Sequence, residues 1–171
     1  MIDAAAPAVR LLVAVVAHFD DHDWDLPERR YIAAGQQQTL AVDDEHLCVS
    51  LIGMTPGASD ATTKGGGYPS KGASAAIVAR AAYMLRLMRC VAVIDDDGCP
   101  PPAEQIHADG LRLLADPGRL LDAVYTWAAA EPHNLTVTIG QVDPVGPEGG
   151  MAGHLLAVTL APVQAVPIGG P

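Results

Sequence analysis

The sequence is poor in aromatic and in basic residues. Phe, Trp and Tyr make up 4% of its 171 residues, and 10 Lys and Arg stand against 20 Asp and Glu, which gives a formal net charge of −10. A core with so few rings must be built mainly from Val, Leu, Ala and Ile, as in a sheet covered by Ala-rich helices. This negative net charge argues against sequence-independent binding to the phosphate backbones of nucleic acids. We therefore expect no direct nucleic-acid partner.

A cysteine framework and a long apolar run are missing as well. The cysteines are Cys48, Cys90 and Cys99. They are odd in number and lack the spacing of a zinc finger or a C-x-x-C motif, so we expect buried or free thiols. The apolar stretch from Met1 to Val16 is shorter than a membrane span, and Arg10 interrupts it, unlike a signal peptide. We expect a soluble protein made in the cytoplasm, with no membrane partner.

Motifs of common enzymes are also absent. No serine lies in a Gly-x-Ser-x-Gly elbow, and the stretch from Lys64 to Gly72 lacks the Gly-Lys-Ser/Thr of a phosphate-binding loop. The acidic segment from His18 to Asp25 is the best metal candidate, but it has no defining spacing. We favour a solvated acidic loop there, and we expect no enzyme, no cofactor and no bound metal. A small metal-dependent hydrolase that uses this segment is the alternative from another class.

Two regions have the apolar spacing of helices. The first stripe consists of Val9, Leu12, Val13 and Val16. These residues recur at i, i+3, i+4 and i+7, which predicts an amphipathic helix from about Ala5 to His18. A second helix is predicted to begin after Pro100 to Pro102, where proline and a nearby acid suit a helix start. Asp116-Pro117 either restarts or kinks this helix before it ends near Glu131.

Alternation of apolar and polar residues predicts five strands. They lie at about residues 30–33, 46–51, 75–93, 135–140 and 155–160. The third of these segments also fits a helix, but we favour a strand because its β-branched residues gather near the turn at Asp95 to Gly98. The resulting fold is of the α/β (α+β) class, with a mainly antiparallel, four- to five-stranded sheet that has helices packed on it. A chain of this length fits a single domain over residues 1–171.

Two Gly-rich connections and one tail remain outside these elements. Residues 54–74, with Lys64, Tyr68 and Lys71 near their centre, are predicted to form a long loop that is mobile in a free subunit and ordered on a partner. A wide hairpin loop is predicted from Asp143 to Gly153, either as an ordered contact element or as an ordinary exposed turn. We expect residues 164–171 to form a short disordered tail.

Arg86 and Arg89 lie on opposite faces of the apolar third strand. Two interpretations stay open for this pair. Each arginine can reach solvent or a carboxylate of the same chain near the strand's end, or at least one of them can pair with an acidic group of a neighbouring subunit. The spacing of the residues does not separate these alternatives.

Laid out in this order, the chain resembles the tail terminator (tail completion) proteins of long-tailed phages that infect actinobacteria. The resemblance runs from about Arg30 to Pro162. Its anchors are Arg30 to Gly35, Glu45 to Ser50, Leu87 to Val93 with the acidic turn and prolines after it, and Gly146 to Gly153. The chain departs from the family where a Trp-Asp-Cys triplet is usual, because it has Val42-Asp43-Asp44 there and carries a cysteine at Cys48 instead.

The resemblance implies a structural virion protein in the tail neck. Such a subunit is expected to form a homo-oligomeric ring, a hexamer, on the last ring of the tail tube protein. It ends tube polymerisation and joins the tail to the head-tail connector or stopper protein. Another neck or tail component, such as a tube subunit or a head-tail stopper, is the nearest alternative. The candidate residues for subunit or tube contacts are Lys64, Tyr68, Lys71, Arg86, Arg89, Pro144, Gly146, Pro147, Glu148, Gly149 and Gly150.

Overall fold

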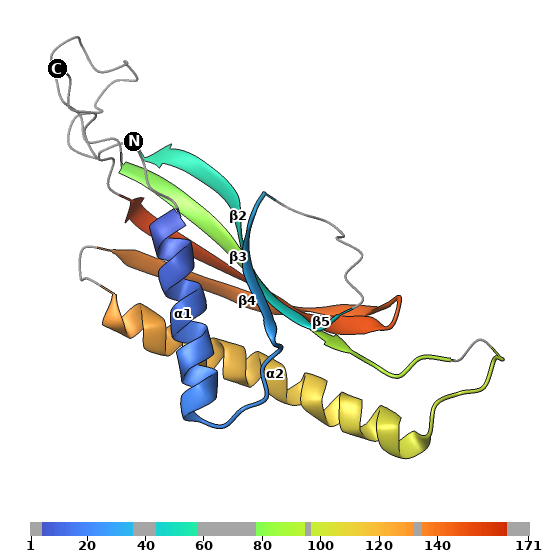
Figure 1. Cartoon of the computed structure of the whole chain (residues 1–171). Coiled ribbons are helices and arrows are strands. Elements are labelled where there is room, and N and C mark those ends of the chain that lie inside the picture. The colour runs from blue at the N-terminus through green and yellow to red at the C-terminus, as the bar shows by residue number, and fades with distance from the viewer. Residues whose placement is uncertain (1–4, 36–43, 58–77, 95–96, 132–134, 164–171) are drawn as a thin grey trace, which may run out of the picture.

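The computed structural model describes residues 5–35, 44–57, 78–94, 97–131 and 135–163 (Figure 1). Its elements, in chain order, are α1 (Ala5–Asp21), β1 (Arg29–Ala34), β2 (His46–Gly57), β3 (Val78–Cys90), α2 (Ala103–Ala130), β4 (Thr136–Glu148) and β5 (Met151–Val163). This is the predicted order of helices and strands. Lys64, Tyr68 and Lys71, most of the predicted loop and the predicted tail lie outside the described residues.

The strands form one five-stranded sheet in the order β1-β2-β3-β5-β4. β1 runs parallel to β2, whereas the other neighbouring pairs are antiparallel. The expected α+β fold with a mainly antiparallel sheet is therefore confirmed, and the parallel pair at one edge makes the sheet mixed. Two helices pack on it, α1 against β1 and β2 and α2 against β4 and β5, and the helices also contact each other (Figure 1).

The core lies between the helices and one face of the sheet. β3 is the central strand, and every second residue from Ala81 to Leu87 is buried on the helix side. It packs there with apolar residues of β2, β5 and both helices. These include Leu11, Phe19, Val49, Leu120, Val124, Trp127, Leu156 and Val158. The choice of a strand over a helix for this segment is confirmed, because only a period of two places these side chains on one face.

α1 exists as predicted, but its buried face and its end differ from the prediction. The buried side chains are Pro7, Ala8, Leu11, Val15 and Phe19. Val13, which was assigned to the buried stripe, is 61% exposed, and Val9 is also exposed. The helix continues to Asp21, so that Phe19, the largest apolar side chain of the segment, lies inside it. This ring fixes the buried face, and spacing of three and four counted back from Phe19 gives the observed set.

α2 is one helix of 28 residues that contains Pro117. Of the two alternatives for this region, a helix that restarts at Asp116 is excluded, because Asp116 is buried inside the continuous helix. Proline has no N–H to donate to the carbonyl four residues before it, which here belongs to Leu113. The His154 side chain replaces that donor, with Nε2 lying 2.8 Å from the Leu113 carbonyl oxygen. A side chain of β5 thus bonds to the helix carbonyl that Pro117 leaves without a backbone donor.

The prediction of a wide hairpin loop from Asp143 to Gly153 is also wrong. β4 and β5 continue through this segment and leave only Gly149 and Gly150 as the turn, both with positive φ. Two residues with φ > 0 are typical of the tight turn that matches strand twist. The prolines are tolerated because β4 is an edge strand, where a missing N–H costs little. They also make that edge a poor template for a further strand.

β2 is longer than predicted, since it runs to Gly57 and includes the first residues of the expected loop.

Among the residues that the structure describes, no helix has the length and apolarity needed to cross a membrane.

Candidate functional site

Two groups of charged and polar side chains meet at α2, at neighbouring turns. The first, which we call the arginine cluster, consists of Asp25, Glu45, Arg89, Arg112 and Asp116. The second, the histidine group, consists of His18, His22 and Asp122. Each group joins α2 to elements that are distant in the sequence.

The arginine cluster is centred on Arg89, whose residue exposure is 0%. Its Nε donates to Asp116 Oδ2 at 2.9 Å and its Nη2 to Asp116 Oδ1 at 3.2 Å, so the pair is bidentate. Nη2 also donates to the backbone carbonyl of Asp25 at 2.8 Å. Nη1 lies 3.3 Å from Asp25 Oδ2 and 3.5 Å from Glu45 Oε2. Of the two interpretations that the sequence left open, the one in which an arginine pairs with carboxylates of its own chain therefore applies to Arg89.

Arg112, which lies one turn of α2 before Asp116, also belongs to the cluster. Its Nη1 and Nη2 donate to the two oxygens of Glu45 at 2.6 and 2.9 Å, and Nη2 also contacts Asp25. Glu45 in turn accepts a bond from the backbone N–H of Cys90 at 3.2 Å. The segment after α1, the start of β2, the end of β3 and α2 are thus tied together at one end of the sheet. This network holds the fold and leaves little bonding capacity for a ligand.

The histidine group depends on how α1 ends. The backbone N–H of Trp24 donates to the carbonyl of Phe19 at 2.9 Å, and that of Asp23 donates to the carbonyl of Asp20 at 3.2 Å. These two bonds, with Asp23 at φ 54°, form a Schellman motif, in which a left-handed residue terminates the helix. Glycine is usual at that position, and aspartate is among the few other residues that tolerate it. The motif keeps His22 beside the last turn of the helix.

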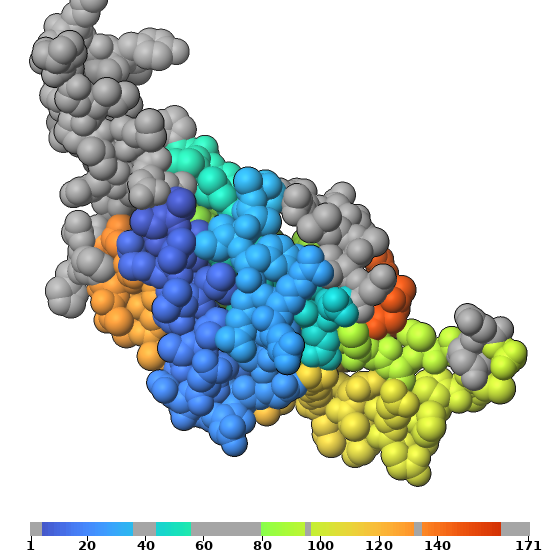
Figure 2. Space-filling view, in the orientation of Figure 1, coloured from blue at the N-terminus to red at the C-terminus, as the bar shows by residue number. Residues whose placement is uncertain are grey.

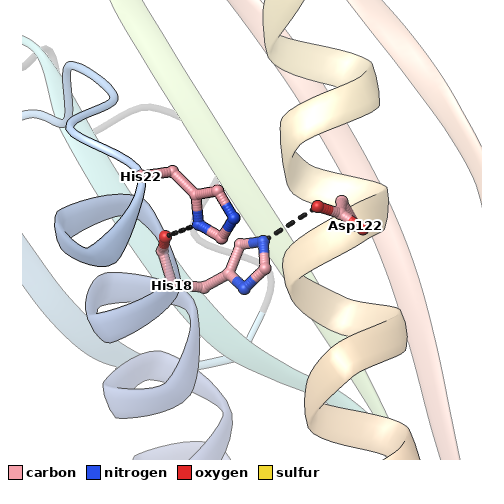
Figure 3. A group of neighbouring side chains, drawn as sticks. All are labelled: His18, His22 and Asp122. Atoms are coloured by element: carbon pink, nitrogen blue, oxygen red, sulfur yellow. Dashed lines mark hydrogen bonds and ion pairs between the residues drawn. The ribbon is translucent and has the colours of Figure 1, made fainter.

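The side chains of His18 and His22 point toward Asp122 on α2 (Figure 3). His18 Nε2 lies 3.0 Å from Asp122 Oδ2. The Nδ1–H of His22 donates to the His18 carbonyl oxygen at 2.8 Å, which leaves Nε2 of that ring as an acceptor. One ligand atom from each of the three residues lies within 4.8 Å of the others. The expected acidic loop is wrong for its first residues, because His18 to Asp21 belong to α1, and the two histidines lie four residues apart at the helix end.

Aromatic rings hold the two imidazoles in place. Trp24 stacks on His22 with a centroid distance of 4.7 Å and meets the edge of His18 at 5.5 Å. Arg119 of α2 covers the same indole, with its guanidinium carbon 5.5 Å from the ring centroid. The histidine group is therefore supported by a ring that is itself packed against both helices.

The sheet face opposite the helices carries a second set of polar groups. His46, Cys48 and Ser50 of β2 lie there and are buried. Burial lowers the pKa of His46, although a bond to the Asp44 carbonyl acts in the opposite direction. Burial raises the pKa of the Cys48 thiol and, beside it, of the Tyr31 hydroxyl. A thiol with a raised pKa is a poor nucleophile, so these residues favour a packing role. Cys48 is buried, whereas Cys90 and Cys99 are exposed.

Arg86 lies on this same face, half-buried and opposite Cys48 and Leu155 in the strand register. The hairpin candidates lie at the far edge, with Pro144, Gly146, Pro147 and Glu148 in β4 and Gly149 and Gly150 in the turn. The turn is anchored within the chain, because the Gly150 carbonyl accepts a bond from the N–H of Val91 at 2.8 Å. The structure does not bring these residues to the arginine cluster or the histidine group.

An exposed apolar stripe on α2 was missed by the sequence analysis. Leu111, Leu114, Leu121 and Tyr125 follow one another at intervals of 3, 7 and 4 residues. Leu114 is 80% and Tyr125 60% exposed, and Leu111 is exposed as well, whereas Leu121 is half-buried. This spacing places Leu111, Leu114 and Tyr125 on one face of the helix, away from the buried face, and Leu121 lies at its margin, where it packs against the core. We call these four residues the outer stripe. The spacing of these residues is visible in the sequence as a second apolar face of the helix.

α2 also extends past the body of the molecule. Its buried residues begin at Asp116, and its first half projects with the connection from β3 (Figures 1 and 2). Val93 and Ile94 of that connection and Ile106 of the helix are exposed. Leu111 and Leu114 belong to the same half of α2, whereas Leu121 and Tyr125 lie in its second half. Exposed apolar residues that gather on a surface are of the kind that marks protein contacts.

The chain matches no protein-family model and no curated protein sequence.

Proposed function

We propose that the chain is a structural subunit of a phage tail, a tail terminator that forms a ring at the head-proximal end of the tail tube. The order of motifs in the sequence supports the family, and the outer stripe on α2 is the observation that carries the role. A stripe of exposed Leu and Tyr along a long helix lowers the solubility of a protein unless another surface covers the stripe. A second copy of the chain is the partner that ring assembly supplies.

A closed ring needs two different surfaces on each subunit that fit each other. The outer stripe is one of them. Val9 and Val13, four residues apart on the exposed face of α1, provide the other. We assign these two surfaces to the two sides of the subunit contact. Arg89 is not part of this interface, because its donors are used inside the subunit.

The decisive experiment removes the gene from the phage that encodes the chain and images the particles. Loss of a terminator leaves unjoined heads and abnormally long tails, whereas normal tails on filled heads would contradict the proposal. A tube subunit would instead be missing from every ring of the tube, so its loss leaves no tube at all. Loss of a stopper leaves tails of normal length. The phenotype therefore also separates the neck and tube alternatives.

Complementation with variants tests the surfaces. Leu114→Glu places a charge in the outer stripe and should fail to restore joined particles, because burying an unpaired carboxylate is costly. Gln105→Glu adds the same charge at an exposed position of the same helix and should restore them. If Leu114→Glu complements as well as Gln105→Glu does, the outer stripe is not an interface. Val13→Glu is expected to behave like Leu114→Glu.

A further inference from the structure

The histidine group has the composition of a transition-metal site. Imidazole nitrogens and a carboxylate oxygen are ligands that zinc uses, and three protein ligands with one open position make a known type of zinc centre. We propose that His18, His22 and Asp122 bind one Zn²⁺ ion that bridges α1 and α2. This inference is independent of the proposed function, and it reverses the expectation that no metal is bound.

The spacing of the ligand atoms fits such an ion after a small movement. Zn–N and Zn–O bonds of about 2.0 Å in a tetrahedron place neighbouring ligand atoms roughly 3.3 Å apart. His18 Nε2 and Asp122 Oδ2 are already 3.0 Å apart, and the ligand atoms of the three residues lie within 4.8 Å of one another. The side chain of Asp122 is exposed and can move to close this gap, whereas Trp24 and the His18 carbonyl hold the His22 ring in place.

The tautomers also fit. The hydrogen bond from His22 Nδ1–H to a backbone carbonyl fixes the proton on that nitrogen and leaves Nε2 for the metal. His18 donates from Nε2 to Asp122, so metal binding through this atom requires its ring proton to move to Nδ1. The ion then takes the place of that proton between the imidazole and the carboxylate. No oxidation, reduction or net loss of a proton from a neutral ring is needed.

The surrounding charges favour a cation. Asp20, Asp21 and Asp23 are exposed beside the two histidines at the end of α1. The carbonyl ends of a helix also carry partial negative charge. Arg119 is the nearby cation, and its guanidinium is held over Trp24 rather than over the three ligands. Binding should therefore join the end of α1 to α2 and make the helix pair more resistant to unfolding.

The test is zinc titration of the full chain, without an affinity tag of histidines and after treatment with a chelator. Calorimetry with ZnCl₂ should give one site per chain, and Mg²⁺ should bind far more weakly because it prefers oxygen ligands. His22→Gln and Asp122→Asn should each reduce the affinity tenfold or more. His107→Gln removes an exposed histidine of α2, and Asp21→Asn removes a neighbouring charge, so both serve as controls that keep the affinity within about threefold.

The outcomes are distinct. Absence of a zinc site in the wild-type chain at micromolar concentrations would overturn the proposal. So would full zinc affinity in Asp122→Asn, because the ion would then not bridge the helices. Each variant is also melted with and without ZnCl₂, and the zinc-dependent rise in Tm is compared within the same variant. This measurement separates loss of the site from a change in folding, since only loss of the site abolishes the rise.

Discussion

Asp116 and Asp122 lie six residues apart on the same helix and have opposite environments. Asp116 has a side-chain exposure of 0% and receives two bonds from Arg89. The side chain of Asp122 is 58% exposed and contacts one imidazole nitrogen. A buried carboxylate must be fully paired, because an unpaired charge in the interior is too costly. An exposed one keeps lone pairs that a ligand can use.

The difference separates groups that hold the fold from groups that can bind. In the arginine cluster, the donors of Arg89 go to Asp116, Asp25 and Glu45, and each partner comes from a different part of the chain. In the histidine group, one imidazole nitrogen of His22 and part of the Asp122 carboxylate remain available. We infer a structural role for the first and a binding role for the second.

The largest effect is expected from Arg89→Met. Within the described part of the chain, the charged partner that then remains for the buried Asp116 carboxylate is Arg119, whose Nη1 is 3.7 Å away. Breaking a buried pair from one side costs about 3–5 kcal/mol of folding free energy. Urea unfolding measures this loss, and Arg89→Met combined with Asp116→Leu should cost less than the sum of the single changes. Asp122→Asn is the control, with a change below about 1 kcal/mol expected for an exposed pair. A loss below 1 kcal/mol for Arg89→Met would remove the distinction between the clusters.

The next effect concerns Pro117, one residue after Asp116. His154→Phe keeps a ring but removes the donor to the Leu113 carbonyl, which should cost about 1–3 kcal/mol. In a Pro117→Ala background the helix regains an N–H that can donate to the same carbonyl. The cost of His154→Phe should therefore fall by about 1 kcal/mol in that background. Unfolding of the four proteins of this cycle gives the coupling, and additive effects would show that the two residues act separately.

The elements were predictable from the sequence because their periods are local. The alternation in the third strand continues into its charged end, and the two faces assigned to Arg86 and Arg89 are those observed. The hairpin was misread because Pro144 and Pro147 indicate a loop unless the strand is known to lie at a sheet edge. Edge position depends on the order of the strands in space, which no local pattern gives.

The two clusters were less predictable than the fold. His18 lies 104 residues from Asp122, and Arg89 lies 64 residues from Asp25. No local spacing shows such partners. The sequence did indicate the segment that contains His18 and His22 as a metal candidate, but recognition of the pair required the helix to continue through Asp20 and Asp21. The outer stripe on α2 could have been found by testing for a second apolar face.

A smaller effect is expected at Asp23, which shapes the histidine group without belonging to it. Its φ of 54° suits glycine, so Asp23→Gly should leave folding stability unchanged or raise it by less than about 1 kcal/mol. Asp23→Val places a β-branched residue in the left-handed region and should cost about 1–2 kcal/mol. The two variants remove the same charge, so the comparison isolates backbone strain. Thermal unfolding measures the difference, and equal Tm values for the two variants would contradict the assignment of a Schellman motif.

The smallest effect concerns His46, which follows Glu45 in β2 but faces away from the arginine cluster. Burial lowers the pKa of His46 in the folded chain below its unfolded value of about 6.5. The unfolded chain therefore binds a proton more readily, and folding stability contributed by the neutral ring is present above pH 6.5 and is lost as the pH falls toward the folded pKa. His46→Gln should flatten this part of the stability curve while leaving stability at pH 8 nearly unchanged. Urea midpoints between pH 5 and 8 provide the measurement, with His107→Gln, which changes an exposed ring, as the control. An identical slope in wild type and His46→Gln would show that the polar face of the sheet, unlike the arginine cluster, contributes nothing that depends on burial.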